Sequence, residues 1–217
     1  MKFVSNREWA LLASILAFPI VPTLGGLLRV VELGGGGPTI IPENPRALAD
    51  PLPIVLHIFS SFIFCAIGAL QFLSSVRHHY PKVHRTTGRV IAVAGCVSAL
   101  TGLRMTHFFV FPEELQGVPL YWTRIVLSLA MIGLIVKAVM EIRSRNVLRH
   151  GAAILRAYAI GQGASTQAIL GFGWTIASGA EPTGAQREGM MVSAWGLNLL
   201  IAELLIRKFV APRTVPT

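Results

Sequence analysis

The sequence predicts an all-α protein, a polytopic membrane helix bundle with about six transmembrane helices, and three observations support this fold class. Of the 217 residues, 53% are hydrophobic, and the mean hydropathy is +0.62. Only 13% are charged, whereas an average soluble domain has about 25%. Long apolar segments also recur along the chain, each close to the roughly 20 residues that cross a bilayer as a helix. These features exclude a soluble globular enzyme, and we expect a single transmembrane domain over residues 1–217.

Six apolar segments of this kind follow one another along the chain. We expect them at residues 9–31, 54–76, 90–110, 122–140, 152–177 and 190–206. Pro19 and Pro22 interrupt the first segment, which a membrane helix tolerates where neighbouring helices satisfy the freed backbone groups. Lys2 and Arg7 precede this segment as they would in a signal peptide, but no small-residue cleavage motif follows it. We therefore expect a retained helix at this position.

The distribution of basic residues predicts how the helices are oriented. Positively charged loops stay in the cytoplasm, and the connections on one side of the predicted bundle, with both termini, hold most of the lysines and arginines. These residues are Lys2, Arg7, Arg77, Lys82, Arg85, Arg89, Arg143, Arg145, Arg149, Arg207, Lys208 and Arg213. The connections on the other side hold only Arg46 and Arg187. Both termini are therefore predicted to be cytoplasmic. The net charge of +9 then reflects membrane topology, and we expect no nucleic-acid partner.

Ionisable side chains inside the predicted helices mark candidate functional sites, because a charged group is costly to keep in hydrocarbon. His57 lies about one turn inside the second segment. Arg104 and His107 are three residues apart, which places them on one face of the third segment. All three lie near the outer ends of their helices, so we expect them to form one outer site. The structural alternative is a histidine bonded to a backbone carbonyl and an arginine that reaches the lipid headgroups.

A second group of candidates lies on the cytoplasmic side. His84 and His150 stand at the cytoplasmic starts of two helices, where they could face each other. Neutral imidazoles bind haem iron, and a facing pair would hold haem b. Arg85, Arg89 and Arg156 would then neutralise the haem propionates or an anionic headgroup. The alternative is a basic cluster that contacts anionic lipid headgroups.

The two histidine pairs, His57 with His107 and His84 with His150, would form an electron path across the bilayer. The stretch from His84 to His107 corresponds to about 35 Å of helix, more than the roughly 30 Å of hydrocarbon. These two side chains must therefore serve opposite faces of the membrane. The spacing is long for two haems that both lie inside the hydrocarbon, and it counts against the haem hypothesis.

The other polar residues of the segments are expected to have structural roles. Lys137 lies near a helix end, where its amine can reach the interface. Glu203 is one turn from Arg207 and is expected to pair with it, while Arg124 lies at the outer start of the fourth segment. Four amide side chains are expected to form hydrogen bonds between helices: Gln71, Gln162, Gln167 and Asn198. No catalytic triad, paired carboxylates or metal-binding CxxC motif is found.

The second to fifth segments also carry a recurring pattern, H…GxxQF…P..HRxxGR…H…RxY. Its residues here are His57, Gly68, Gln71, Phe72, Pro81, His84, Arg85, Gly88, Arg89, His150, Arg156 and Tyr158. The pattern resembles that of an uncharacterised family of predicted bacterial integral membrane proteins, a domain of unknown function. The resemblance covers about residues 53–167, leaves the flanking helices at 9–31 and 190–206 outside, and departs from the family at Ala153, where an aromatic residue is usual. It implies a multi-pass protein of the bacterial inner membrane and supplies no reaction. The histidine-bearing core is also similar in outline to cytochrome b561-type proteins, a likeness of architecture alone.

Two classes of function fit these observations. The first is a haem-binding or quinone-interacting protein of transmembrane electron transfer, with His57, His84, His107 and His150 as candidate iron ligands. The second is a non-catalytic accessory subunit or assembly factor of a larger membrane complex, which the lack of a complete catalytic constellation favours. A small transporter is a third hypothesis, and the absence of a visible inverted repeat argues against it. The sequence leaves open whether the protein is an enzyme.

Overall fold

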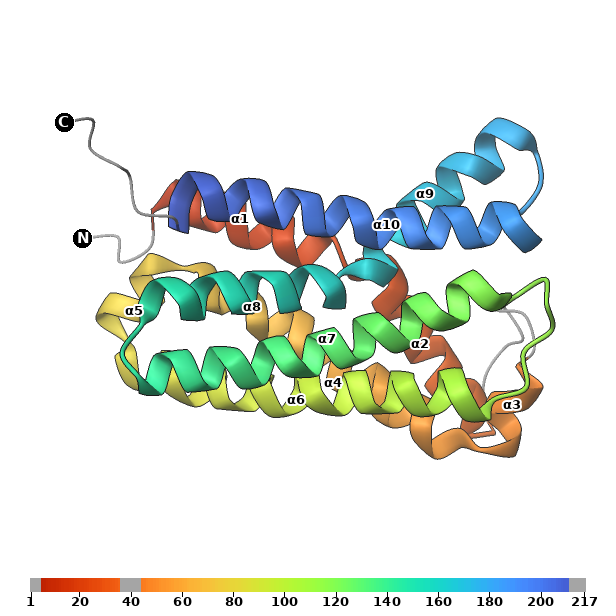
Figure 1. Cartoon of the computed structure of the whole chain (residues 1–217), viewed down its shortest axis with the longest axis horizontal. Coiled ribbons are helices and arrows are strands. Elements are labelled where there is room, and N and C mark those ends of the chain that lie inside the picture. Colours follow the sequence, from red (N-terminus) through yellow and green to blue (C-terminus); the bar gives the residue numbers. More distant parts are fainter. Residues whose placement is uncertain (1–4, 36–43, 211–217) are drawn as a thin grey trace.

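The computed structural model describes residues 5–35 and 44–210, and these residues fold only into helices joined by short connections (Figure 1). The α-helices are α1 (Asn6–Ala17), α2 (Ile20–Leu33), α3 (Pro45–Ala49), α4 (Pro51–Ala69), α5 (Ser74–His79), α6 (Pro81–Phe108), α7 (Val118–Arg143), α8 (Val147–Gly161), α9 (Gly163–Ser178) and α10 (Gly184–Leu205). A 3₁₀ turn, Leu70–Phe72, continues α4, and a π-helical turn, Ile206–Val210, continues α10. The predicted all-α fold class is confirmed.

Four helices within the described part of the chain are long and apolar enough to cross a membrane. They are Pro51–Phe72, Pro81–Phe108, Val118–Arg143 and Gly184–Lys208. A fifth candidate exists if α1 and α2, which are bent by 44° at their junction, form one span. The break between them falls at Phe18 and Pro19, where the sequence predicts an interruption. The protein is thus a helical bundle with four to five candidate membrane-spanning helices.

The predicted fifth segment, residues 152–177, is divided into two helices. α8 and α9 meet at Gln162, and neither is among the candidate spans. The glycines on both sides of the break have packing reasons, because Gly161 lies against Phe64 of α4 and Met131 of α7, while Gly163 lies against α10. A Cβ atom added to Gly163 would lie 1.9 Å from Nε1 of Trp195, so only glycine fits at this approach. The chain crosses the bundle here as two successive helices, α8 and α9, and not as one continuous helix.

Two other boundaries also differ from the prediction. Residues 74–76, expected at the end of the second segment, belong to α5. α6 begins at Pro81, nine residues earlier than expected, because proline is favoured in the first turn of a helix. His84, Arg85 and Arg89 therefore lie in a helix and not in a loop.

The hydrophobic core lies where α4, α6, α7 and α8 pack together. Phe64, Ile91, Ile135 and Tyr158 contribute one large buried side chain from each of these helices. Gly95 of α6 lies among them, and an added Cβ atom would be 2.7 Å from both Phe64 and Ile135. α4 and α7 therefore both approach α6 closely at this glycine.

The connections between helices gather at two ends of the bundle (Figure 1). α1 begins and α10 ends at the same end as α5 and the α7–α8 turn. At the opposite end, the backbone N–H of Gly184 donates to the carbonyl oxygen of Glu114 at 3.1 Å. This bond places the start of α10 beside the α6–α7 connection. α8 and α9 together therefore run from one end of the bundle to the other.

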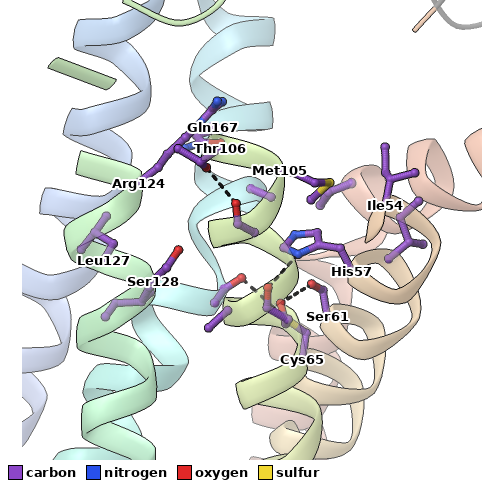
Figure 2. A pocket seen from close by; sticks show the side chains of 18 of the residues that line it. Ile54, His57, Ser61, Cys65, Met105, Thr106, Arg124, Leu127, Ser128 and Gln167 are labelled. Carbon is purple, nitrogen blue, oxygen red and sulfur yellow. Dashed lines mark hydrogen bonds between the residues drawn. The ribbon is translucent and has the colours of Figure 1, made fainter. Parts of the chain in front are cut away.

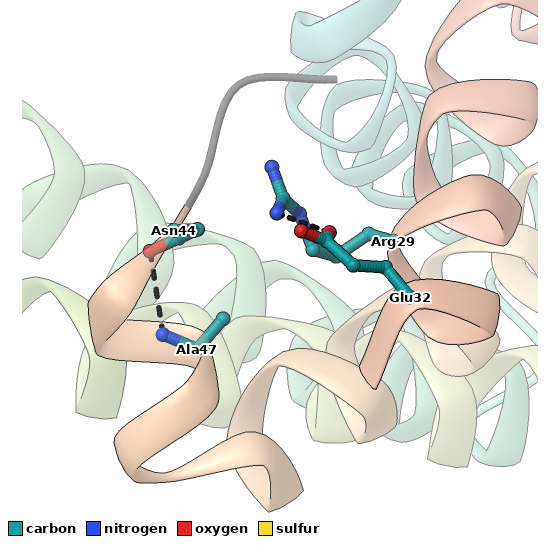
Figure 3. A network of polar contacts seen from close by, with 4 residues as sticks. All are labelled: Arg29, Glu32, Asn44 and Ala47. Atoms are coloured by element: carbon teal, nitrogen blue, oxygen red, sulfur yellow. Dashed lines mark hydrogen bonds and ion pairs between the residues drawn. The ribbon is translucent and has the colours of Figure 1, made fainter. Parts of the chain in front are cut away.

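Local polar contacts fix the helix ends on both sides of residues 36–43, which lie outside the described residues (Figure 3). Arg29 and Glu32 form an ion pair in the last turns of α2. Asn44 caps α3, since its side-chain oxygen accepts a hydrogen bond from the backbone N–H of Ala47 at 3.3 Å. α3 thus begins with a capped N-terminus at Asn44, which also lines the cavity described below,.

Candidate ligand-binding cavity

A cavity of about 540 Å³ lies within the bundle, lined by α2, α4, α6, α7, α10 and the segment where α8 meets α9. Its walls are mostly apolar, with a smaller number of polar side chains. These include Thr23, Asn44, His57, Ser61, Ser98, Thr106, Arg124, Ser128, Ser165 and Gln167. Figure 2 shows His57 projecting from α4 toward α6, with Arg124 and Gln167 together at one end. An apolar cavity with a few convergent polar groups is the usual form of a small-molecule site.

His57 is held in one orientation by the backbone of α6. Its Nδ1 lies 2.9 Å from the carbonyl oxygen of Ser98 and 3.2 Å from the hydroxyl of Thr101. A carbonyl oxygen only accepts hydrogen bonds, so Nδ1 carries the proton and donates. In the neutral imidazole, Nε2 is then an acceptor, and no described residue donates to it. The structural alternative, a histidine bonded to a backbone carbonyl, is thus found at Nδ1, while Nε2 has no hydrogen-bond partner among the described residues.

Gly102 of α6 leaves open space beside this imidazole. A Cβ atom added to Gly102 would lie 3.4 Å from Cε1 and 3.7 Å from Nδ1 of His57, and 3.8 Å from Oγ of Ser128. One methyl group would therefore touch side chains of α4 and α7 at once. Without it, a cradle about the size of one methyl group is open between the His57 imidazole and the Ser128 hydroxyl.

Arg124 places a positive charge at one end of the cavity. Its Nη1 donates to the side-chain oxygen of Gln116, and the Gln116 amide donates to the carbonyl oxygen of Thr106 at 3.2 Å. The guanidinium carbon also lies 5.5 Å from the ring centroid of Phe111, within the range of a cation–π contact. A guanidinium has five N–H donors, so Arg124 is fixed in place with donors to spare for a ligand.

Arg124 is a charged cavity residue that was not a site candidate in the sequence analysis, because it was expected to lie at the outer start of a helix. α7 begins at Val118, six residues before Arg124, so Arg124 lies inside a candidate span. Pro119 in the first turn is the signal that predicts this earlier start. Gln167 was expected to bond between helices, and its amide does donate to the carbonyl oxygen of Met191 at 3.3 Å.

The three outer candidates are not brought together. His57 lines the central cavity, whereas Arg104 and His107 line a separate groove of about 500 Å³ between α6 and α7. Nδ1 of His107 lies 2.8 Å from the phenol oxygen of Tyr121. Arg104 forms an ion pair with Asp50 at 3.0 Å. His57 therefore lies in a different space from Arg104 and His107, although the sequence predicts all three near the outer ends of their helices.

The inner histidines lie near each other. His84 and His150 are close enough for their charges to interact. Nδ1 of His150 lies 2.9 Å from the carbonyl oxygen of Ala138, while Nδ1 of His84 is buried without a hydrogen-bond partner among the described residues. Neither histidine lines the central cavity or the α6–α7 groove. Arg85 and Arg89 are exposed on α6.

Arg156, the last inner candidate, joins α8 to α10. Its Nε and Nη2 lie 2.5 and 2.8 Å from the two carboxylate oxygens of Glu203. The expected ion pair of Glu203 with Arg207 is thus wrong, and Arg207 acts on this carboxylate only at longer range. The guanidinium fork on α8 offers two parallel hydrogen bonds, so the pairing between helices prevails over the pairing within one.

Several residues of the sequence pattern form one packed cluster where α4, α6 and α8 meet. The Gln71 amide donates to the hydroxyl of Thr87 at 2.7 Å. The Tyr158 hydroxyl donates to the carbonyl oxygen of Cys65, also at 2.7 Å. A Cβ atom added to Gly68 would lie 2.7 Å from the Tyr158 ring, which explains the glycine. These contacts give the pattern a structural role in joining three helices.

The four candidate histidines do not fit a bis-histidine haem in either of these two spaces. Such a haem needs two imidazoles that face each other across one iron. Of the four, the central cavity has His57 alone and the groove has His107 alone, while His84 and His150 line neither. Within residues 5–35 and 44–210, no group of three or more His, Cys, Asp or Glu side chains could hold a metal ion.

The chain matches a protein-family model described as "Predicted membrane protein (DUF2306)" over residues 54–206. The match begins in α4 and ends after α10, so it extends beyond the expected 53–167 and leaves α1 to α3 outside. A search of the curated proteins and of the solved structures found no match. The matched region is more than half of the chain and contains most of the cavity wall. The protein therefore belongs to the DUF2306 family of predicted membrane proteins, and its bundle contacts the lipid bilayer.

Proposed function

We propose that the protein binds a membrane quinone in its central cavity. The observation that carries the proposal is the state of His57, whose Nδ1 is held by the Ser98 carbonyl while Nε2 is an acceptor without a described partner. A quinol hydroxyl is a donor and matches this acceptor. The quinone form has carbonyl oxygens that need donors, which Arg124 and Ser128 supply from the same cavity.

The rest of the cavity suits an apolar ring. Leu127, Met131 and Ile160 line it together with Phe62, so a flat hydrophobic ligand would bury its faces against carbon atoms. A volume of about 540 Å³ lies within the roughly 300–1,000 Å³ usual for small-molecule sites. A strongly hydrophilic ligand would lose hydration against these walls without replacement hydrogen bonds.

Quinone is better supported than haem among the two redox ligands expected from the sequence. A quinone needs one orienting imidazole, and the cavity has one in His57. Haem b with two histidine ligands needs a facing pair inside one space. The inner pair, His84 and His150, stays a candidate for that role by proximity alone.

The proposed setting is the bacterial inner membrane, with six crossings and both termini in the cytoplasm. α1 with α2 and α8 with α9 would each form one broken crossing, added to the four unbroken helices. Two observations support this arrangement. α8 and α9 connect opposite ends of the bundle, and the α7–α8 end, where α1 begins and α10 ends, carries the excess of lysine and arginine that keeps a loop inside.

Quinone binding is tested by titrating the purified protein, in lipid nanodiscs, with a benzoquinone that carries a ten-carbon chain. Trp195 lines the cavity, so we expect saturable quenching of its fluorescence, and Trp195→Phe identifies that signal. Gly102→Val fills the cradle beside His57 and Ser128. It is expected to weaken binding at least about tenfold, or 1.4 kcal/mol.

The matched control is Gly133→Val on α7, where an added Cβ atom meets nothing within 4 Å. This variant is expected to bind the quinone like the wild-type protein. Thermal unfolding of both variants separates loss of the site from loss of the fold. Equal quinone affinity for Gly102→Val and wild type, with both proteins folded, would overturn the proposal, as would the absence of saturable quenching.

A further inference from the structure

One wall of the cavity is continuous with the outer surface of the bundle. Leu52, Leu56, Phe59 and Phe62 are spaced three or four residues apart and form the exposed stripe of α4,. Phe59 and Phe62, which are 46% and 48% exposed, also line the cavity. In a membrane-spanning helix this stripe faces hydrocarbon. The cavity therefore reaches the surface where the surroundings are lipid chains.

α2 forms the other side of this opening. Pro22, Thr23 and Leu27 face the cavity along one side of the helix. No residue of α2 is buried, and Leu27 is 45% exposed although it lines the cavity. α2 packs closely on α4 at Gly26 and Ile58, but it covers the space only in part, because Leu27, Phe59 and Phe62 line the cavity and are also exposed.

We infer that the bound quinone carries a long apolar chain, which leaves the cavity between α2 and α4 and lies against Leu27, Phe59 and Phe62. The inference rests on the proposed function, because the quinone ring is what occupies the space beside His57. The inference adds the path of the quinone chain and the direction from which the quinone enters the cavity. The ligand is a chain-bearing lipid quinone that enters sideways from the bilayer.

The chemistry of the opening argues for such a chain. Apart from the Thr23 hydroxyl, the side chains at its rim are hydrocarbon, so a polar substituent placed there would be desolvated with few hydrogen-bond partners. Other polar groups of the cavity, at His57, Ser128 and Arg124, are less exposed than Leu27, Phe59 and Phe62 at the rim. A molecule with one polar ring and one apolar chain matches both regions in a single pose. A ligand chain suits this opening better than a partner helix does, because the opening is continuous with the proposed site of the quinone ring.

Photo-crosslinking locates the chain directly. Two benzoquinone probes are used in nanodiscs, one with a diazirine at the far end of a ten-carbon chain and one with a diazirine on the ring. The chain probe is expected to label peptides that contain Leu27, Phe59 or Phe62. The ring probe is expected to label those that contain Ser128 or Met131. An excess of unlabelled quinone should suppress both reactions.

A pair of adjacent substitutions on α2 provides the matched variants. Thr23→Trp places an indole in the opening, because Thr23 lines the cavity. Leu24→Trp places the same group on the outer face, since Leu24 is 56% exposed and is not part of the wall. We expect Thr23→Trp to weaken the chain-bearing quinone about tenfold and to leave a chain-free benzoquinone unchanged. Leu24→Trp should change neither affinity.

The outcomes separate this inference from the proposed function. Suppressible ring labelling with chain labelling on α7 or α10 would overturn the inference and leave quinone binding intact. The same holds if Thr23→Trp and Leu24→Trp bind the chain-bearing quinone equally well. Chain labelling that unlabelled quinone does not suppress would show a lipid chain or a partner in the opening, and would also overturn it. The absence of suppressible labelling by both probes would instead remove the proposed function.

Discussion

At the scale of single residues, glycines that face another helix decide how closely the bundle packs. A Cβ atom added to Gly95 would lie 2.7 Å from Phe64 and Ile135, both buried in the core. Gly95→Ala is therefore expected to destabilise the fold by about 1–3 kcal/mol through overpacking. Gly133→Ala, where an added Cβ atom meets nothing within 4 Å, should be neutral or stabilising. Thermal unfolding in detergent measures both, and equal midpoints for the two variants would contradict this account.

The sequence identified one cavity residue correctly and missed its neighbours. His57 was singled out because an imidazole is costly in hydrocarbon, and it does line the cavity. The same criterion selected His107, which faces a different groove. Depth along a helix can be read from the sequence, but rotation about the helix axis depends on contacts with other helices. The sequence does not predict that Gly102 borders the cavity, because its position beside His57 and Ser128 depends on how α4, α6 and α7 pack together.

At the scale of elements, apolar length predicted where helices exist and failed to predict where they break. The four unbroken spans correspond to predicted segments because roughly 20 apolar residues suffice to identify a crossing. The break at Gln162 depends on Trp195 of α10, which approaches Gly163 from a segment about thirty residues away,. The early start of α6 was signalled by Pro81, which the apolar criterion passed over. The error at Gln162 therefore comes from a contact across the fold, whereas the error at α6 comes from a local signal that apolar length does not include.

The ion pair between α8 and α10 is the element-scale contact most open to measurement. Glu203 binds Arg156 with two hydrogen bonds, while Arg207 is the partner that sequence spacing favours. Because both paired side chains are about a third exposed, we expect a coupling of only about 0.5–1 kcal/mol. A double-mutant cycle of Arg156→Ala with Glu203→Ala, read by thermal unfolding, should give this value. The cycle with Arg207→Ala should give less, and a larger coupling to Arg207 would refute the assignment.

At the scale of the whole molecule, composition was sufficient for the fold class but not for the site. A chain with 13% charged residues and long apolar segments has few solutions other than a membrane bundle of helices. The family match over residues 54–206 includes α10 and the rest of α9, which lie beyond the range of the sequence resemblance. Those helices complete the cavity through Gln167, Met191 and Trp195. The site is therefore a property of the assembled bundle, and no segment of the chain contains it alone.

The proposed orientation leads to a prediction for the two ends of the bundle. Ser144 is exposed in the turn between α7 and α8, and Glu113 is exposed in the connection at the opposite end. In a protein with Cys65 and Cys96 replaced by alanine, Ser144→Cys should react with a membrane-impermeant maleimide only in inverted vesicles. Glu113→Cys should react only in intact spheroplasts, because the end rich in lysine and arginine stays in the cytoplasm. The opposite pattern would reverse the proposed topology. Reaction of both cysteines from one side would mean that α7, which separates them, does not cross the bilayer.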